Sequence, residues 1–289
     1  MQINLKSDSR IKAYLRRIGL YEAPTLRYLQ EQHLKTVPYE NLDIIRNIPI
    51  SLKTEDLYEK IVTRRRGGYC FELNGLFAWL LRGLGYKVEE HLARYLRNEQ
   101  LDLRNEQLDL RNEQLESGVP MQKHRVLRVR VKDMDYICDV GMGAVTPMKP
   151  LPMVFGQIIE QKEERYKLER EMLFGNALNV LYEWKKNKWS RIYSFSDEKS
   201  HAIDFVMPSF YCENHPGSFF RKMDMVHMFT EEGRKTVAGR ELRVYTSHGM
   251  KSILPGSEGM YRDQLKQHFG IDLRNCIQPI KTLSYTNPC

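Results

Sequence analysis

Residues 66–84 read RGGYCFELNGLFAWLLRGL, and this stretch decides how the first third of the chain folds. Two glycines break the chain, and apolar side chains then recur every three or four residues, which is the spacing of one helix face. The apolar stripe consists of Leu73, Leu76, Phe77, Leu80, Leu81 and Leu84. We expect a core helix that ends at Gly85, because glycine readily adopts the left-handed conformation found after helix ends.

Cys70 lies one turn before this stripe, at the expected N-terminus of the helix. The positive end of the helix dipole favours a thiolate, and a neighbouring imidazolium can lower the pKa of a cysteine from about 8.5 to roughly 3.5 to 7.5. The same position also suits an inert cysteine in the core. From these residues alone, both a nucleophile and a buried small hydrophobe remain open for Cys70.

The pattern divides the chain into a helical block, a β block and a mixed block. Expected helices span residues 9–18 and 25–37, a third is capped by Thr54, and another lies near 261–269. The second helix ends before Pro38, since a proline disfavours helical backbone in the residue that precedes it. Expected strands span residues 126–131, 136–140, 178–182, 189–195 and 241–245.

The strands 126–131 and 136–140 flank a polar turn from Lys132 to Asp135, which predicts a hairpin. His124 opens the first strand, and Asp139 lies in the second. Because side chains alternate between the two faces, a four-residue turn places both on one face, but it puts Arg128 opposite Asp139. The alternation therefore supports a His124–Asp139 pair, whereas the expected register requires a bulge, strand twist or a different turn to bring them together.

The composition excludes several classes of protein. Of 289 residues, 42% are hydrophobic and 28% charged, as in ordinary globular chains. The longest apolar runs fall short of the roughly 18 residues that span a membrane, and the N-terminus has no apolar secretory segment, so we expect a cytoplasmic protein. The five cysteines are widely spaced and odd in number, which argues against a disulfide framework, and no cluster predicts a metal site.

The net charge of +8 and the isoelectric point near 9.1 indicate an anionic partner. A nucleic acid and a phosphate-bearing small molecule would both satisfy this charge. The chain contains no zinc-finger spacing, RNP-like segment or long basic tract, and its densest basic run, residues 64–66, leads directly into the glycine pair. The charge alone does not choose between the two partners.

Residues 96–116 contain three tandem seven-residue units, LRNEQLD twice and then LRNEQLE. The leucines lie five and two residues apart, so at about 100° per residue they form no continuous helical seam. Three such polar units are also too short for a solenoid. We expect a mobile surface loop inserted in the β block, which the fold tolerates because the entropy of loop closure grows slowly with length.

Several segments together resemble the arylamine N-acetyltransferases. The RGGYC string with Glu72, Leu73 and Asn74 after it resembles the active-cysteine motif of this family. The other similar segments are 34–42 with its Pro-Tyr-Glu-Asn-Leu run, 120–131 around His124 and 139–143 (DVGMG), with weaker echoes at 214–219 and 269–271. The resemblance implies that Cys70 is the nucleophile, His124 the base and Asp139 the group that orients the imidazole.

The resemblance also implies an α+β fold with a cysteine-protease-like Cys-His-Asp triad. Its parts would be an N-terminal helical bundle over residues 1–85, a central β-barrel over 86–195 with the 96–116 insertion, and a C-terminal α/β lid over 196–289. The implied reaction moves an acetyl group from acetyl-coenzyme A, through an acetyl-cysteine, to arylamines, arylhydrazines or N-hydroxyarylamines, as in xenobiotic metabolism. No metal is implied, and the phosphates of coenzyme A would account for the positive charge.

Further contacts follow from the same segments. Candidate contacts for a coenzyme A phosphate are the backbone amides near Gly141, Gly143 and Thr146. Candidate substrate-pocket residues are Tyr39, Tyr69 and Met142, the last standing where the family commonly has an aromatic residue. Glu40 and Arg66 are charged residues inside two of the motifs, and we expect them to pair and to fix the turn before Cys70.

Two other functions remain open. The order Cys-His-Asp also serves cysteine hydrolases and transglutaminase-like enzymes, which would cleave or exchange amides rather than use a coenzyme A thioester. A basic nucleic-acid-binding protein with a vestigial triad would explain the charge without any acyl transfer.

Overall fold

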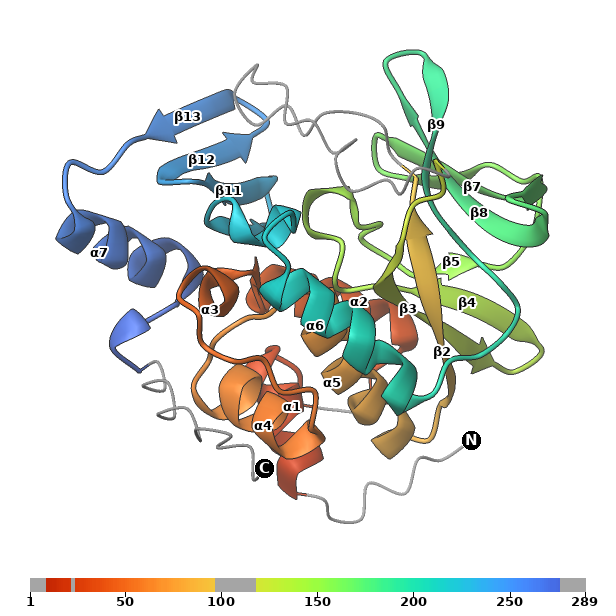
Figure 1. Cartoon of the computed structure of the whole chain (residues 1–289), viewed down its shortest axis with the longest axis horizontal. Helices are drawn as coiled ribbons and strands as arrows, with labels where there is room; N and C mark the ends of the chain where they lie inside the picture. Colours follow the sequence, from red (N-terminus) through yellow and green to blue (C-terminus); the bar gives the residue numbers. More distant parts are fainter. Residues whose placement is uncertain (1–8, 22–23, 97–117, 276–289) are drawn as a thin grey trace, which may run out of the picture.

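The computed structural model describes residues 9–21, 24–96 and 118–275 of the chain. Residues 97–117, which hold nearly all of the predicted repeat insertion, lie outside these ranges. Figure 1 shows an eight-stranded sheet on the right and a five-stranded sheet on the upper left, with the first helices below and between them. The fold is therefore mixed α/β, and none of the described helices is long and apolar enough to cross a membrane.

The first part of the chain is helical, as the apolar spacing predicts. Its elements are α1 (Ser9–Arg17), α2 (Leu26–Thr36), β1 (Tyr39–Glu40), α3 (Leu42–Ile45), α4 (Thr54–Tyr58), the π-helical turn η1 (Glu59–Thr63) and α5 (Cys70–Gly83). Thr25 caps α2 by accepting a hydrogen bond from the Tyr28 N–H. The predicted cap at Thr54 is wrong, because the carbonyl of Lys53 already accepts the first helical bond, so that Thr54 is inside the helix.

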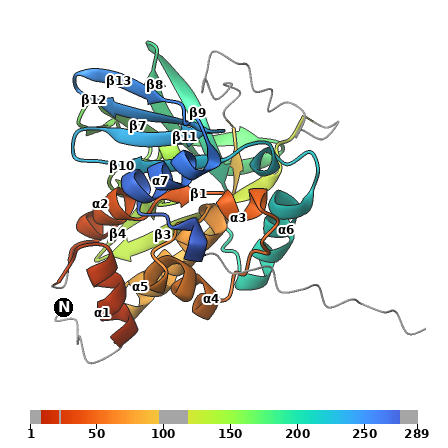
Figure 2. The same cartoon turned by 90° about the vertical axis from the view of Figure 1, so that its left-hand side faces the viewer.

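α5 is the central helix of the first core. It begins at Cys70, and Gly85 beyond its end adopts a left-handed φ of +87°, as predicted. The side chains of its apolar stripe are buried against α1, α2 and the outer faces of two strands. Figure 2 shows α1, α4 and α5 on the side of the molecule away from β12 and β13. The helix therefore joins the helical part to the larger sheet, and Cys70 lies at its start.

The eight-stranded sheet is antiparallel and contains the middle part of the chain. Its strands are β2 (Lys87–Tyr95), β3 (Gln122–Val131), β4 (Met134–Cys138), β5 (Leu151–Pro152), β6 (Ile159–Gln161), β7 (Glu164–Leu173), β8 (Asn176–Lys185) and β9 (Lys188–Phe195). They are ordered β5-β4-β3-β2-β9-β8-β7-β6. The side chain of Gln161 bridges the two edges by hydrogen bonds to both backbone groups of Lys149, at 2.9 Å each. The sheet is thus nearly closed into a barrel.

The predicted β3–β4 hairpin is present, but its turn is two residues long rather than four. Val131 pairs with Met134, and Arg130 pairs with Asp135, which accepts hydrogen bonds from Arg128 and Arg130. These cross-strand ion pairs keep Asp135 in the strand instead of the turn. The register is therefore shifted by two residues from the predicted one, and its continuation places Asp139 against Val126, diagonal to His124.

The last part of the chain is mixed, as expected, and contains a segment of helices followed by the second sheet. Its elements are η4 (Ala202–Phe205), α6 (Val206–Asn214), η5 (Phe219–Arg221), β10 (Met225–Phe229), β11 (Arg234–Ala238), β12 (Glu241–Thr246), β13 (Gly249–Ile253), α7 (Glu258–Phe269) and η6 (Leu273–Asn275). The two-residue β1 of the first part pairs with β10, so the sheet order is β1-β10-β11-β12-β13. The first and last parts of the chain therefore share one sheet.

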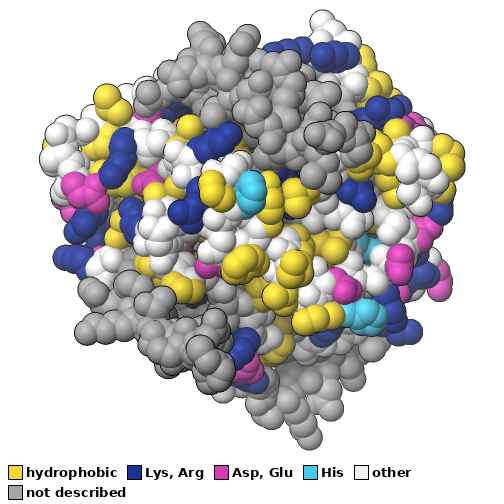
Figure 3. All heavy atoms as spheres, in the orientation of Figure 1, with side chains coloured by type: hydrophobic (Ala, Val, Ile, Leu, Met, Phe, Trp, Pro, Cys, Tyr) yellow, Lys and Arg dark blue, Asp and Glu magenta, His cyan; other side chains and the backbone are white. Residues whose placement is uncertain are grey.

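The segment η4–α6 crosses the front of the molecule in Figure 1 and has two different faces. Phe205, Ser209 and Cys212 point inward and are buried. Met207 and Phe210 on the outer face are 75% and 62% exposed, and Figure 3 shows apolar side chains gathered over this region. The segment therefore attaches to the molecule through its inner face, which lies over the first turn of α5.

Candidate active site

The turn before Cys70 is pressed against residues 38–40. The Gly68 N–H donates to the carbonyl of Pro38 at 3.4 Å, and the Glu40 N–H donates to the carbonyl of Gly68 at 2.8 Å. A Cβ atom on Gly67 would lie only 1.9 Å from the carbonyl oxygen of Pro38. Only glycine fits this close approach of two backbones, which explains the glycine pair in front of the helix.

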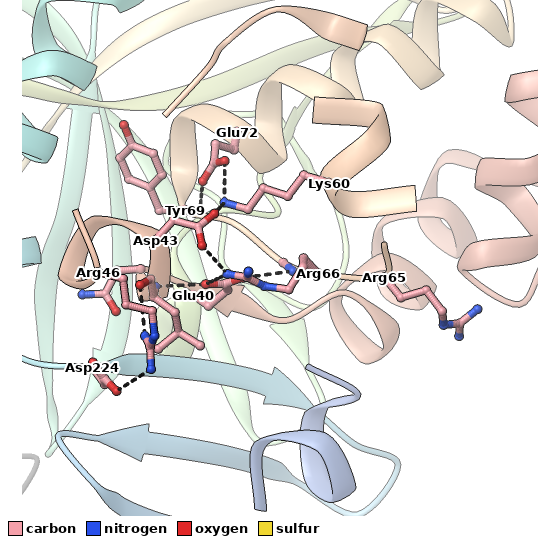
Figure 4. A network of polar contacts seen from close by, with 12 residues as sticks. Glu40, Asp43, Arg46, Lys60, Arg65, Arg66, Tyr69, Glu72 and Asp224 are labelled. Atoms are coloured by element: carbon pink, nitrogen blue, oxygen red, sulfur yellow. Dashed lines mark hydrogen bonds and ion pairs between the residues drawn. The ribbon is translucent and has the colours of Figure 1, made fainter. Parts of the chain in front are cut away.

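A buried set of charged side chains holds this turn in place; we call it the turn network (Figure 4). It consists of Glu40, Asp43, Lys60, Arg66 and Glu72. Arg66 donates to Glu40 through Nε at 2.8 Å and through Nη2 at 3.0 Å, and its Nη2 also lies 2.7 Å from Asp43. The predicted Glu40–Arg66 pair is confirmed.

Lys60 extends the turn network to the first turn of α5. Its Nζ lies 2.7 Å from Asp43 and 2.8 Å from Oε1 of Glu72, whose other oxygen accepts a hydrogen bond from the Tyr69 N–H at 3.2 Å. Burial raises the pKa of Glu72 to about 7, although Lys60 opposes the rise. Burial would also raise the pKa of Asp43, but Lys60 and Arg66 outweigh it and lower that pKa to about 2.

Cys70 is buried at the start of α5, with 3% of its surface exposed. Its Sγ donates to the carbonyl of Lys123 at 3.8 Å, and a Cβ on Gly141 would lie 2.6 Å from the Cα of Cys70. Burial raises the pKa of the thiol well above its ordinary value, and Cys212 and Asp139 raise it further. The lowered pKa expected from the helix dipole is therefore outweighed by burial in this structure.

The buried side chains of His124 and Asp139 meet, as the alternation of the strands predicts. Nε2 of His124 lies 2.7 Å from Oδ2 of Asp139. The other oxygen, Oδ1, accepts hydrogen bonds from Nδ2 of Asn74 at 2.9 Å and from the Gly141 N–H at 2.8 Å. The carboxylate thus has three hydrogen-bond donors, which together hold it in one orientation toward the imidazole.

Asn74 connects the two halves of this arrangement, a role that was not predicted from the sequence. It lies one turn after Cys70 in α5, and its amide donates both to Asp139 and, at 2.6 Å, to the carbonyl of Arg125. Its Oδ1 accepts the Val140 N–H at 2.9 Å. The sequence feature that could have indicated this role is the spacing of one helical turn between Cys70 and Asn74, which places both residues on one side of α5.

The residues suggested for coenzyme A contacts are largely engaged within the protein. The Gly141 N–H donates to Asp139, and the buried Thr146 accepts the Met142 N–H through Oγ1 at 3.2 Å. Gly143 has a left-handed φ of +62°, so it serves the turn. The geometry gives these positions a local structural role, and their contact with a phosphate stays a prediction. In the described ranges, no three His, Cys, Asp or Glu side chains are arranged to hold a metal ion.

The three suggested pocket residues lie in different surroundings. Tyr39 is partly buried, and its ring lies 3.4 Å from the position of a Cβ on Gly143. Tyr69 is fully buried, and its hydroxyl is hydrogen-bonded to Ser209 at 2.5 Å, so its side chain presents no surface to a substrate here. Met142 is partly buried against the core of the barrel. A contact between these residues and a substrate stays a prediction.

Comparisons with known proteins identify the family of this chain. Residues 22–277 match the N-acetyltransferase family. An arylamine N-acetyltransferase of Mycolicibacterium smegmatis is 34% identical, over 90% of this chain and 91% of its own. The solved arylamine N-acetyltransferase of Mycobacterium tuberculosis has a TM-score of 0.78 at 32% identity, covering 91% of this chain and 94% of that one.

A second solved structure is that of the Mycobacterium marinum arylamine N-acetyltransferase in complex with CoA. Its TM-score is 0.79 at 29% identity, and the alignment covers 93% of this chain and 95% of that one. The matches in sequence and in structure each extend over nearly the whole length of both partners. The chain therefore belongs to the arylamine N-acetyltransferase family of acyltransferases.

Proposed function

We propose that the protein transfers an acetyl group from acetyl-coenzyme A to an aromatic amine, with Cys70 as the nucleophile. The observation that carries this proposal is the buried His124–Asp139 pair, which lies beside a cysteine at the start of a helix. Sγ of Cys70 donates a hydrogen bond to the carbonyl of Lys123, the residue before His124. The thiol therefore lies beside the strand segment that carries the imidazole. Asp139 orients the ring through Nε2 and leaves Nδ1 for the cysteine.

The raised pKa of Cys70 determines how the nucleophile forms. A lone thiolate is disfavoured in this buried position, so the proton of Sγ must pass to Nδ1 of His124 and leave a thiolate–imidazolium pair. Asp139 stabilises the imidazolium across the ring. The pair then separates charge within the site without adding net charge, which lowers the cost of burying the thiolate.

The reaction proceeds in two steps. In the first, the thiolate attacks the carbonyl carbon of the acetyl thioester, the bond from that carbon to the coenzyme A sulfur breaks, and His124 returns its proton to the leaving sulfur. In the second, the amine nitrogen attacks the acetyl-cysteine, His124 accepts a proton from the nitrogen, and the bond to Sγ breaks. The product amide leaves, and Cys70 returns to its starting state.

The substrates and the organisation of the chain follow from family membership. The coenzyme A complex of the Mycobacterium marinum protein supports the thioester as the donor. The proposed acceptors are arylamines, arylhydrazines and N-hydroxyarylamines, in a cytoplasmic protein that acts on xenobiotics. The proposed domains are a helical bundle over residues 1–85, a β-barrel over 86–195 and an α/β lid over 196–289, with the site where the first two meet.

Steady-state kinetics test this function. Rates with acetyl-coenzyme A and an aniline, a hydrazine or an N-hydroxyarylamine should give parallel double-reciprocal lines, because coenzyme A leaves before the amine reacts. Cleavage of an amide substrate, without any release of coenzyme A from acetyl-coenzyme A, would instead support a cysteine hydrolase. Salt-dependent binding of DNA or RNA, without any thiol reactivity, would support a nucleic-acid-binding protein.

A further inference from the structure

The guanidinium of Arg125, the residue after His124 in β3, is almost completely buried, with 7% of the residue exposed. Its Nη1 donates to the carbonyl of Phe71 in the first turn of α5 at 3.0 Å. Its Nε donates to Glu90 of β2 at 2.6 Å, and Nη2 bonds to the same carboxylate. One face of the group lies 4.2 Å from the ring centre of Phe205 in η4. A single side chain thus joins three segments that are far apart in the sequence.

The contacts of β3 with α5 lie on both sides of His124. On one side, the carbonyl of Lys123 accepts from Sγ of Cys70. On the other, the carbonyl of Arg125 accepts from Asn74, while its side chain donates to Phe71. The register of β3 against β2 shifts at this point, since Ala93 pairs with His124 and the next residue pairs with position 122. A bulge bends the strand and re-aims its side chains, and the contacts of residues 123 and 125 with α5 hold the strand on both sides of the imidazole.

The sequence of α5 carries an independent sign of this arrangement. Gly75 lies in the interior of the helix, where glycine is less favourable than alanine. A Cβ at this position would lie 2.5 Å from Nη1 of Arg125 and 3.1 Å from its Cζ. The glycine therefore opens the helix surface for the guanidinium. A lysine at position 125 would not replace the arginine. A single ammonium group cannot form two hydrogen bonds to Glu90, reach the carbonyl of Phe71 and stack on the ring of Phe205 at the same time.

We propose that Arg125 is a positioning residue, which sets the distance and angle between the His124 imidazole and Cys70 by tying β3 to the first turn of α5. The inference rests on the proposed function, in which these two groups exchange a proton. Arg125 itself touches no reacting atom. Since a displacement of about 1 Å in a catalytic pair can cost about 100-fold in rate, loss of the tie should slow the chemistry even in protein that remains folded.

The test measures alkylation of Cys70 by iodoacetamide as a function of pH, in the folded protein and without acetyl-coenzyme A. We expect Arg125→Ala to lower the limiting rate by about 10- to 100-fold and to raise the pH at half-maximal rate, because a displaced imidazole no longer accepts the proton of the buried thiol. Guanidinium or methylguanidinium at concentrations that do not denature should restore part of the rate by occupying the vacated space. The matched control is Arg128→Ala, which removes an arginine of the same strand that pairs with Asp135 instead of α5.

A second variant keeps the inference testable if Arg125→Ala does not fold. Gly75→Ala improves helix propensity, yet its methyl group displaces the guanidinium, so it should also slow alkylation. An unchanged pH profile in both variants, or an equal loss in Arg128→Ala, would overturn the positioning role. These outcomes differ from failure of the proposed function, which would show in the unmodified protein as no release of coenzyme A with any acceptor, whatever the alkylation rates of the variants.

Discussion

The two ends of the β3–β4 hairpin carry carboxylates in opposite surroundings. Asp139, just beyond β4, is 2% exposed and accepts hydrogen bonds from His124, Asn74 and Gly141. At the other end, Asp135 pairs with two arginines whose side chains are 25% and 46% exposed. One carboxylate is held inside the protein by neutral or titratable donors, and the other is shared between cations that reach water.

The difference shows that similar hydrogen bonds contribute differently to stability at the buried end of the hairpin and near its turn. The arginines that pair with Asp135 reach water, which partly screens these pairs, and exposed pairs typically contribute about 0–1 kcal/mol, so their main effect is to fix the strand register. Asp139 is buried, and removing one of its partners leaves a buried polar group unsatisfied, which costs several kcal/mol. We therefore expect substitutions at the buried end to change chemistry and those at the hairpin tip to change little.

The largest expected effect is that of Asp139→Asn. The amide presents both donors and an acceptor, so it no longer fixes the tautomer of His124, and acetyl transfer should fall by about 10⁴-fold, as for the corresponding change in a serine triad. The rate of acetyl transfer at saturating donor measures this effect. Asp135→Asn, an identical chemical change at the other end of the hairpin, is the control. Equal losses in the two variants would remove the distinction between the two ends.

A second buried carboxyl group, Glu72, should make the stability of the protein depend on pH. Its pKa is raised from 4.5 to about 7, so between these pH values the unfolded chain releases the proton that the folded protein keeps. Stability should consequently fall by about 3 kcal/mol as the pH rises through this window and then level off. Glu72→Gln cannot titrate, so its stability should lack this fall.

Urea unfolding of both proteins at a series of pH values measures the effect. Because the remaining titrating groups are common to both, the difference between the two curves isolates Glu72. Superimposable pH dependences would mean that this carboxyl does not titrate between pH 4.5 and 7.

The smallest effect is expected at the hairpin tip. Asp135→Asn should lower the free energy of unfolding by less than about 1 kcal/mol and leave acetyl transfer unchanged, because the arginines can turn to solvent. Added salt should reduce even this difference, since it screens exposed charges. Thermal unfolding at low and high ionic strength provides the measurement. A loss of several kcal/mol would show that the tip is as tightly constrained as the buried end.

Much of the fold follows from local sequence. The helical stripe of α5, the glycine at its end and the alternation in β3 and β4 are visible within a few residues, so these elements could be predicted. The two-residue β1 could not, because its pairing with β10 joins residues nearly 190 positions apart and has no local pattern. The hairpin register was missed because Asp135 is a typical turn residue that two arginines hold in the strand.

In the site, too, features carried by local sequence could be predicted, whereas features that depend on distant segments could not. The motif around Cys70 and the same-face placement of His124 and Asp139 follow from the sequence and its resemblance, and the structure brings the last two within 2.7 Å. The helix dipole alone does not lower the pKa of Cys70, since burial is a property of the whole fold and outweighs it. Asn74 and Arg125 were missed because their partners come from other segments.

The central claim is that Cys70 carries the acetyl group. The most direct measurement is the mass of the protein and of its peptides after mixing with acetyl-coenzyme A in the absence of an amine. The account predicts that one acetyl group is gained on the peptide that contains Cys70, that an aromatic amine removes it, and that Cys70→Ser and His124→Ala do not acquire it. Acetylation of Cys138 or Cys212 at the same rate, or rapid amide formation by Cys70→Ser, would contradict the account.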